Sequence, residues 1–366
     1  MILFAHGLSR SKTILLAIFL LTSFYLLFSH VRPAVYHHAF QQTAQQSHHE
    51  SVQYSPEAQI SNISINLVVA TLAADDISWT STLPIPNLNI IRYESDSPFA
   101  SFHPPVARGR EALIYHTYLH DFYDDLPDIS IFIHSHENPW HVDPALRQSM
   151  TFALSQLDVH QVMRKQYFNL RVSWKDACPA WINTTKTPEE SIKQEEPFMA
   201  EAFHANFGHD VPVPEILAGP CCSQFAVTRD AIQRRSKEEY KRYMEWLVNT
   251  DWSDYISGRV WEHMWPWLFL EEAEDCTPEF EALCRMYAIC FEGPQELEQY
   301  QRLWQEKDDL KERTEFVNEL LRPGQARSAR MRMDTIGNLL ERKLEQALRR
   351  GRSAGIRQQT TKDLPW

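Results

Sequence analysis

The chain has 366 residues, of which 43% are hydrophobic and 23% are charged, so it is not a wholly disordered or collagen-like protein. Its 36 Lys and Arg residues against 48 Asp and Glu residues give a formal net charge of −12. This charge argues against a nucleic-acid partner. The low number of Gly residues, 10, argues against a nucleotide-binding fold built on a glycine-rich loop.

Residues 13–31 form an apolar run without Asp, Glu, Lys or Arg, and this run reaches the lower length limit of a membrane-spanning helix, roughly 17 residues. Arg10 and Lys12 precede the run, so the positive-inside rule places residues 1–12 in the cytosol. We therefore predict a signal-anchor helix at 13–31, which makes the chain a single-pass type II membrane protein of the Golgi or endoplasmic reticulum lumen. A cleaved signal peptide is the alternative.

Further features are typical of a protein that faces an oxidising lumen. Asn62 and Asn183 each begin an N-glycosylation tripeptide. All six Cys residues follow the apolar run, and an even number permits up to three disulfides. Cys276, Cys284 and Cys290 lie close together and indicate a loop closed by a disulfide, with a zinc site as the alternative.

Beyond the apolar run, the composition divides the chain into three parts. Residues 32–60 are rich in Gln, His and Ser and predict a flexible stem. Residues 61–294 carry the apolar segments of a folded lumenal domain, and residues 295–366 predict a charged helical tail. Within residues 328–350, one helical face carries Ile336, Leu339, Leu340, Leu344 and Leu348. This face predicts a tail that packs on itself or forms a homo-oligomer, and contact with an anionic membrane is the alternative.

The folded part begins with the pattern of an α/β domain. Short apolar runs predict buried strands at residues 65–71, 88–93 and 129–134, and helical spacing predicts a helix at 109–123. This order predicts a single α/β domain with a mostly parallel central sheet. Further helices are expected at residues 144–157, 190–204, 230–248 and 258–267, the last cut or kinked by Pro266.

Three histidines, His134, His136 and His141, follow the third predicted strand within eight positions. Ligand sites in α/β sheets form beyond the carboxyl ends of the strands, and neutral imidazole is a good metal ligand. Residues i and i+2 of a strand share a face, so we expect His134 and His136 to contact a metal or substrate in one pocket. Hydrogen bonds to the following loop are the alternative role.

Acidic residues occur near two other predicted elements. Asp75 and Asp76 follow the first strand, where a carboxylate can bind the ribose or base of a nucleotide, or can cap the next helix. Glu262 lies among Trp and Met residues, and apolar surroundings would suit a general base. His263 is a candidate fourth residue of a metal site. The alternative for Glu262 is a structural pair with Arg259.

Cys221 and Cys222 are adjacent in the sequence. In an oxidising lumen we expect a disulfide beside a turn here, and a nucleophilic cysteine is the alternative.

A series of motifs resembles the fungal domain-of-unknown-function family 3431 over about residues 64–292. The motifs are GREA at 109–112, YDDLPD at 123–128, FIH at 132–134, WH at 140–141, GPCCSQFAV at 219–227, WL at 246–247, SGRV at 257–260, Glu262, and the cysteines at 276, 284 and 290.

The layout of these motifs is in turn similar to A-type glycosyltransferases, which implies a single domain of that fold, a nucleotide-sugar donor and a divalent metal, Mn or Mg. Arg110 and Glu111 of the GREA motif are, together with Asp75 and Asp76, the candidate donor-binding residues. A-type enzymes usually carry an Asp-x-Asp motif at the end of the central strand, whereas this chain reads His134-Ser135-His136. Either the metal is held differently or the domain has no catalytic metal.

Three hypotheses of different classes follow. The first is a glycosyltransferase-like membrane enzyme that moves a sugar to a hydroxyl acceptor, with Glu262 as the base. The second is a metal-dependent hydrolase or oxidase that uses the histidine cluster. The third is a non-catalytic scaffold tethered to the membrane, with the tail as its partner surface.

Overall fold

The computed structural model describes residues 62–175, 177–311, 314 and 321–362. The predicted cytosolic segment, signal-anchor helix and stem, residues 1–60, lie outside these described residues. Within the described part, none of the helices has the length and apolar composition that a membrane crossing requires.

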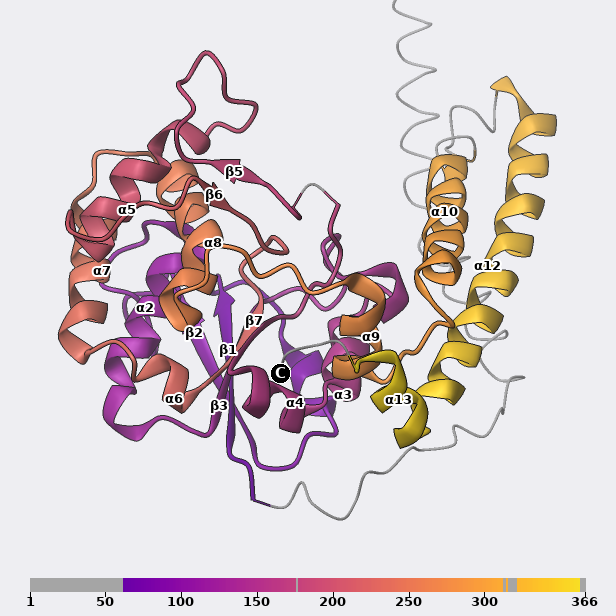
Figure 1. Cartoon of the computed structure of the whole chain (residues 1–366), viewed down its shortest axis with the longest axis horizontal. Helices are drawn as coiled ribbons and strands as arrows, with labels where there is room; N and C mark the ends of the chain where they lie inside the picture. Colours follow the sequence, from indigo (N-terminus) through magenta and orange to yellow (C-terminus); the bar gives the residue numbers. More distant parts are fainter. Residues whose placement is uncertain (1–61, 176, 312–313, 315–320, 363–366) are drawn as a thin grey trace, which may run out of the picture. The chain divides into compact units, whose positions relative to one another are not determined.

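A five-stranded mixed sheet forms the centre of the fold (Figure 1). Its strands, in spatial order, are β2 (Leu88–Glu94), β1 (Ile65–Thr71), β3 (Ile129–His134), β7 (Phe225–Thr228) and β4 (Tyr167–Asn169). β1 pairs in parallel with both β2 and β3, whereas β7 is antiparallel to both β3 and β4. Four strands therefore run in one direction and β7 runs against them, which confirms the three predicted strands within an α/β domain.

The central strands are buried on both faces because their sequences are almost continuously apolar. Along β1, Ile65, Leu67 and Val69 enter one hydrophobic core, and Val68 enters the other. Side chains alternate between the faces of a strand, so the sheet separates two cores. A second, two-stranded sheet pairs β5 (Ile182–Asn183) with β6 (Ile216–Leu217).

Helices cover both faces of the sheet (Figure 1). One core contains residues of α2 (Arg110–Asp121), α5 (Met199–Phe207), α6 (Arg229–Ile232), α7 (Lys237–Asn249) and α8 (Asp254–Leu270). The other contains residues of α3 (Met150–Gln156), α4 (Val159–Lys165), α9 (Glu279–Tyr287), α10 (Pro294–Lys311) and α12 (Pro323–Gly351). Helix α13 (Ala354–Thr360) follows α12, and four short 3-10 helices are η1 (Ser78–Thr82), η2 (Tyr123–Asp125), η3 (Pro144–Leu146) and η4 (Glu196–Phe198).

Several predicted helices have different bounds for identifiable reasons. The helix expected at 230–248 is two helices, because Ser236 begins α7 with a capping box to Glu239. The helix expected at 258–267 begins earlier, after the N-cap Ser253, and continues through Pro266. The segment at 144–157 divides into η3 and α3, and the helical part of 190–204 is confined to η4 and α5.

The apolar face of the tail helix is buried within the chain. Ile336 and Leu344 are 1% exposed and Leu340 is 6% exposed, and all three belong to the same core as β1. This is the self-packing that the sequence predicts, and the homo-oligomer remains a prediction.

Three disulfides join the six cysteines. They are Cys178–Cys276, Cys221–Cys222 and Cys284–Cys290. The pair Cys284–Cys290 closes the predicted loop, but Cys276 pairs with a cysteine 98 residues away. The disulfide expected at Cys221 and Cys222 joins these two neighbours to each other.

Candidate functional site

The carboxyl ends of the parallel strands β1 and β3 bring two predicted site residues together. Asp75 accepts a hydrogen bond from the Leu72 amide at 2.9 Å and lies beside Ser135 and His136, which directly follow β3. Burial opposes ionisation of Asp75, but the Leu72 amide and the Ser135 hydroxyl outweigh it. The charges of His136 and Arg92 add to this effect, so the pKa of Asp75 lies below its usual value. Asp75 is an ionised carboxylate where α/β sheets place ligand sites.

Asp76 is exposed and has a local role. Its carboxylate accepts a hydrogen bond from the Ser78 amide at 2.8 Å, and this bond lowers the pKa of Asp76. This contact fits the capping alternative, since η1 begins at Ser78. Trp79 of η1 donates from Nε1 to the Ser135 carbonyl at 2.9 Å, which fixes η1 against the end of β3.

His134 and His141 are in contact at the end of β3. His134 Nδ1 and His141 Nε2 are 3.2 Å apart, and the Gln224 side chain hydrogen-bonds His141. The His134 amide also donates to Gln224 Oε1 at 3.4 Å. Burial, and next the neighbouring His134, lower the pKa of His141 to about 4, so His141 is neutral at physiological pH.

The donor in the contact between His134 and His141 depends on the tautomers of the two rings. On the other side of the ring, His134 Nε2 faces Glu111, whose Oε1 is 3.9 Å away, and this buried nitrogen has no hydrogen-bond partner in the part of the chain that the structure describes. Burial opposes ionisation of Glu111, but His134 outweighs it and lowers the pKa of the carboxyl. A carboxylate and an imidazole nitrogen are therefore available together.

A close contact between two helices holds Glu111 in place. Gly109 precedes α2 with φ of +62°, a conformation that glycine adopts without strain. A Cβ atom on Gly258 of α8 would lie 3.0 Å from the Gly109 carbonyl oxygen. The Gly109 amide donates to the Asp254 carboxylate at 3.1 Å. The start of α2, with Arg110 and Glu111, is thus fixed against the start of α8.

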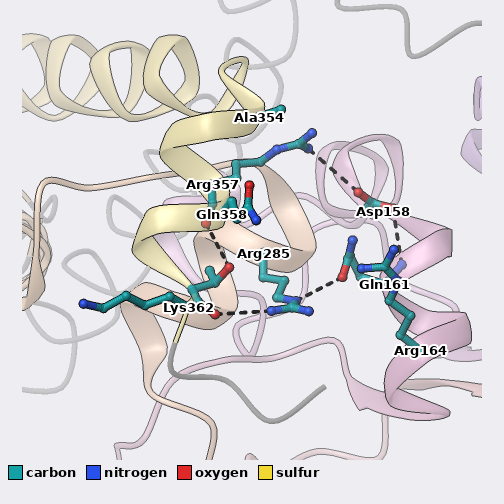
Figure 2. Close-up of a pocket in the computed structure, with 9 residues that line it drawn as sticks. Asp158, Gln161, Arg164, Arg285, Ala354, Arg357, Gln358 and Lys362 are labelled. Atoms are coloured by element: carbon teal, nitrogen blue, oxygen red, sulfur yellow. Dashed lines mark hydrogen bonds and ion pairs between the residues drawn. The ribbon is translucent and has the colours of Figure 1, made fainter.

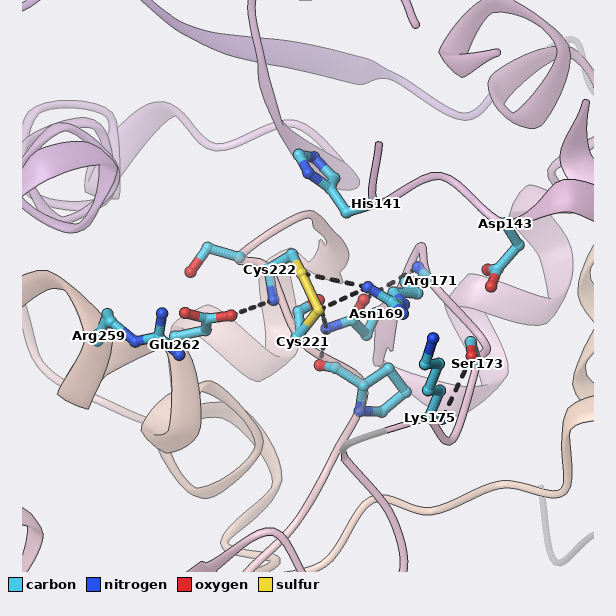
Figure 3. The surroundings of a disulfide bond; sticks show 12 residues. His141, Asp143, Asn169, Arg171, Ser173, Lys175, Cys221, Cys222, Arg259 and Glu262 are labelled. Carbon is cyan, nitrogen blue, oxygen red and sulfur yellow. Dashed lines mark hydrogen bonds between the residues drawn. A yellow bond between two sulfur atoms is a disulfide. The ribbon is translucent and has the colours of Figure 1, made fainter. Parts of the chain in front are cut away.

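The disulfide Cys221–Cys222 lies between Glu262 and Arg171 (Figure 3). The Cys222 amide donates to Glu262 Oε1 at 2.5 Å, and Arg171 contacts Cys221 Sγ at 2.9 Å. The surroundings of Glu262 therefore include a polar amide, rather than the purely apolar contacts expected. Trp140, 76% exposed, lies beside Arg171, whose guanidinium carbon is 5.8 Å from the ring centre.

His263 belongs to a buried charge cluster with Glu195. Its Nε2 lies 3.1 Å from Glu195 Oε1, and Arg259 approaches the same oxygen at 2.9 Å. Burial opposes ionisation of Glu195, but His263 and then Arg259 lower its pKa to about 2. Arg259 and Arg110 both lie against the ring of Tyr255, at 5.2 and 5.1 Å. His263 is thus engaged in a structural pair.

The four predicted metal-site histidines do not form a shared ligand set. Among the described residues, the one group of three or more His, Cys, Asp or Glu side chains close enough to share an ion is Cys221, Cys222 and Glu262. Its two sulfurs form a disulfide, so they are not thiolate ligands. His136 is exposed and bonds Ser135 at 3.0 Å, because β3 ends at His134 and the alternation of a strand no longer applies. Glu111 and His134 are the remaining donor pair.

The sequence pattern did not single out four residues that shape this site. Gln224 hydrogen-bonds the His134 amide and the His141 side chain, and Arg171 contacts the disulfide. Tyr255 contacts Arg110 and Arg259, and Glu195 pairs with Arg259. Gln224 lies inside the motif at 219–227, and this motif is the one sequence signal that points to it. The other three depend on tertiary contacts.

The comparisons with known proteins give one match. No curated protein and no solved structure matches the chain. The family described as "Protein of unknown function (DUF3431)" matches residues 67–285, which include the strand ends, the histidine pair and Glu262. The chain therefore belongs to this family of proteins of unknown function.

Proposed function

We propose that the chain is a glycosyltransferase-like enzyme that moves a sugar from a nucleotide-sugar donor to an acceptor hydroxyl. The observation that carries this proposal is the meeting of Asp75 with Ser135 and His136 at the carboxyl ends of two adjacent parallel strands. Nucleotides bind at this edge in α/β sheets. The single antiparallel strand β7 within an otherwise parallel sheet supports an A-type glycosyltransferase fold as part of the proposal.

The nucleotide-sugar donor lies along this edge. Asp75 is ionised and partly exposed, so it can accept hydrogen bonds from a ribose or a base. Arg110 at the start of α2 is exposed and rests on Tyr255, and its guanidinium suits the diphosphate of the donor. Asp76 is the less favoured donor contact because its carboxylate is used by Ser78.

The acceptor hydroxyl is activated by Glu262. Its Oε1 is held by the Cys222 amide, and its Oε2 accepts no hydrogen bond from the described residues. Oε2 takes the proton of the acceptor hydroxyl as the acceptor oxygen forms a bond to the anomeric carbon. The bond from that carbon to the diphosphate breaks, and the nucleoside diphosphate leaves with the electron pair.

The protein ligands at this site would suffice for a divalent metal only if the substrate supplied the remaining ligands of the ion. Mg and Mn sites commonly combine one or two protein ligands with substrate phosphates. Glu111 and His134 Nε2 are the side chains that would hold such an ion. Bound there, it would neutralise charge on the leaving diphosphate. The metalloenzyme hypothesis needs more protein ligands than this pair supplies, so we do not favour it.

The membrane placement is part of the same proposal. Residues 13–31 anchor the chain, and residues 61–366 face the Golgi or endoplasmic reticulum lumen. Three disulfides and the absence of free cysteines among the described residues support an oxidising compartment.

The test is an assay of the full chain in detergent against a panel of nucleotide sugars and hydroxyl acceptors, with release of nucleoside diphosphate as the readout. We expect Glu262→Gln to lower turnover by roughly 100-fold or more, because removal of a general base costs about 10²–10⁴ in rate. The matched control is Glu272→Gln, an exposed glutamate just after α8, which should keep full activity. Equal turnover of the two variants would remove Glu262 from the mechanism.

A further inference from the structure

A polar pocket lies away from the candidate site, between α4, α9 and α13 (Figure 2). Its volume is about 480 Å³, which is within the range of small-molecule sites, roughly 300–1,000 Å³. Of the described residues that line it, Ala354 is the one apolar residue, and the lining therefore suits a polar ligand. The lining residues are Asp158, Gln161, Arg164, Arg285, Ala354, Arg357, Gln358, Thr361 and Lys362.

Positive charge predominates in this pocket. Among the described residues, Arg164, Arg285, Arg357 and Lys362 line it against a single carboxylate, that of Asp158. The pocket carries this positive charge although the chain as a whole has a net charge of −12.

The guanidinium groups are partly preorganised. Arg285 donates to Gln161 Oε1 at 3.0 Å and to the Thr361 carbonyl at 3.3 Å. Arg357 reaches from α13 to Asp158, with 3.8 Å between the charged atoms (Figure 2). Fixed guanidinium groups lose less entropy when they bind an anion.

Like charges also face each other across the pocket. Burial, and then the positive charge of Arg164, lower the pKa of Arg285. An anion bound between these two side chains would relieve their repulsion.

From this arrangement we propose that the pocket between α4, α9 and α13 binds a phosphate-bearing ligand. Guanidinium groups recognise phosphate oxygens through paired, charge-assisted hydrogen bonds, and three of them line this pocket. The phosphate belongs either to a soluble compound or to a lipid headgroup. This proposal does not depend on the proposed transferase activity.

The experiment is isothermal titration calorimetry of the full chain in non-ionic detergent, with inorganic pyrophosphate and with short-chain phosphatidylinositol 4-phosphate as the probes. The pocket variant is Arg164→Gln with Arg357→Gln. The matched control is Arg327→Gln with Arg342→Gln, which removes the same charge from exposed positions on α12 outside the pocket. Each lost guanidinium should weaken binding about tenfold, so the pocket variant should bind roughly 100-fold more weakly.

The single variant Arg164→Gln is a control for folding, because this side chain is exposed on α4 and its replacement should not disturb the fold. This variant should bind the probe about tenfold more weakly than the wild type. Pyrophosphate binding that the pocket variant loses supports a soluble ligand, and binding of the phosphoinositide alone supports a lipid headgroup. If both probes bind, the probe that binds more tightly identifies the source of the phosphate.

The variant His134→Ala should bind the probe with the same affinity as the wild type, which distinguishes this pocket from the candidate active site. Binding of neither probe, or equal binding by the pocket variant and its control, overturns the proposal.

Discussion

At the scale of single residues, the site depends on short turns that fix side chains from distant parts of the chain. Gln224 hydrogen-bonds the His134 amide and the His141 side chain, while the Cys222 amide, two residues earlier, holds Glu262. Trp265 Nε1 donates to Ser223 Oγ at 3.0 Å, which ties the same turn to α8. One turn therefore holds the end of β3, the His141 imidazole and the Glu262 carboxylate.

The buried cluster around Glu195 gives a pH prediction at this scale. Its carboxyl has a pKa of about 2 instead of 4.5, because His263 and Arg259 favour its ionised form despite burial. A lowered pKa in the folded state stabilises the protein above about pH 4.5, and this stabilisation is lost as the pH falls toward 2. Glu195→Gln should therefore lower the free energy of unfolding at pH 7 by about 3 kcal/mol, at about 1.4 kcal/mol per pKa unit.

Urea unfolding at a series of pH values measures this effect. The difference between the wild type and Glu195→Gln should shrink as the pH falls toward 2. Glu189→Gln, at an exposed position of the same segment, is the control and should leave the curve unchanged. A pH-independent difference between wild type and Glu195→Gln would contradict the role given to this carboxylate.

At the scale of elements, the site depends on how closely α2 approaches α8. The absence of a side chain at Gly258 makes this approach feasible, and the approach sets the position of Arg110 and Glu111 relative to the helix that carries Glu262. A larger side chain at Gly258 would push the two helices apart, because the backbone oxygen of Gly109 cannot move away as a flexible side chain can.

We expect Gly258→Ala to lower the free energy of unfolding by about 1–3 kcal/mol, since its Cβ would lie 3.0 Å from a backbone oxygen. Gly337→Ala in α12 is the matched control. Its Cβ would meet only Lys307 at 3.7 Å, so the higher helix propensity of alanine should stabilise the protein by up to about 1 kcal/mol. Thermal or urea unfolding measures both changes, and a stabilising Gly258→Ala would show that the helices are not in tight contact.

At the scale of the whole described chain, the charged tail contributes to the core of the domain. Leu297 and Tyr300 of α10 and Leu344 of α12 are buried in the core that also contains β1. The tail helices therefore stabilise the sheet on which the site is built, and removal of the tail would expose this apolar surface to water.

Leu344→Ala tests this packing. Leu344 is 1% exposed, so we expect a loss of about 2–5 kcal/mol in the free energy of unfolding, from lost burial and from the cavity that remains. Leu321→Ala changes the same side chain at a position that is 70% exposed and should alter stability by less than about 0.5 kcal/mol. If both variants unfold like the wild type, the tail does not share the core.

The strands and the order of elements were predictable from the sequence, because short, almost continuous apolar runs such as 65–71 and 129–134 are typical of buried strands. The place of the site at the strand ends followed from that order. The partners of each site residue were not predictable. His263 pairs with Glu195, 68 residues away, and Cys276 pairs with Cys178, and no local pattern encodes contacts of this range.

The most direct test of the central claim is a thermal-shift measurement of nucleotide-sugar binding to the full chain, with and without Mn. A ligand at about 100 times its dissociation constant adds roughly 2.7 kcal/mol of stability, which raises the melting temperature by several degrees. We predict such a shift for at least one nucleotide sugar, its loss in Asp75→Asn and His134→Ala, and its retention in His209→Ala, a change at an exposed histidine. The absence of a shift with every nucleotide sugar, or an equal shift in all three variants, would contradict a donor site at the ends of β1 and β3.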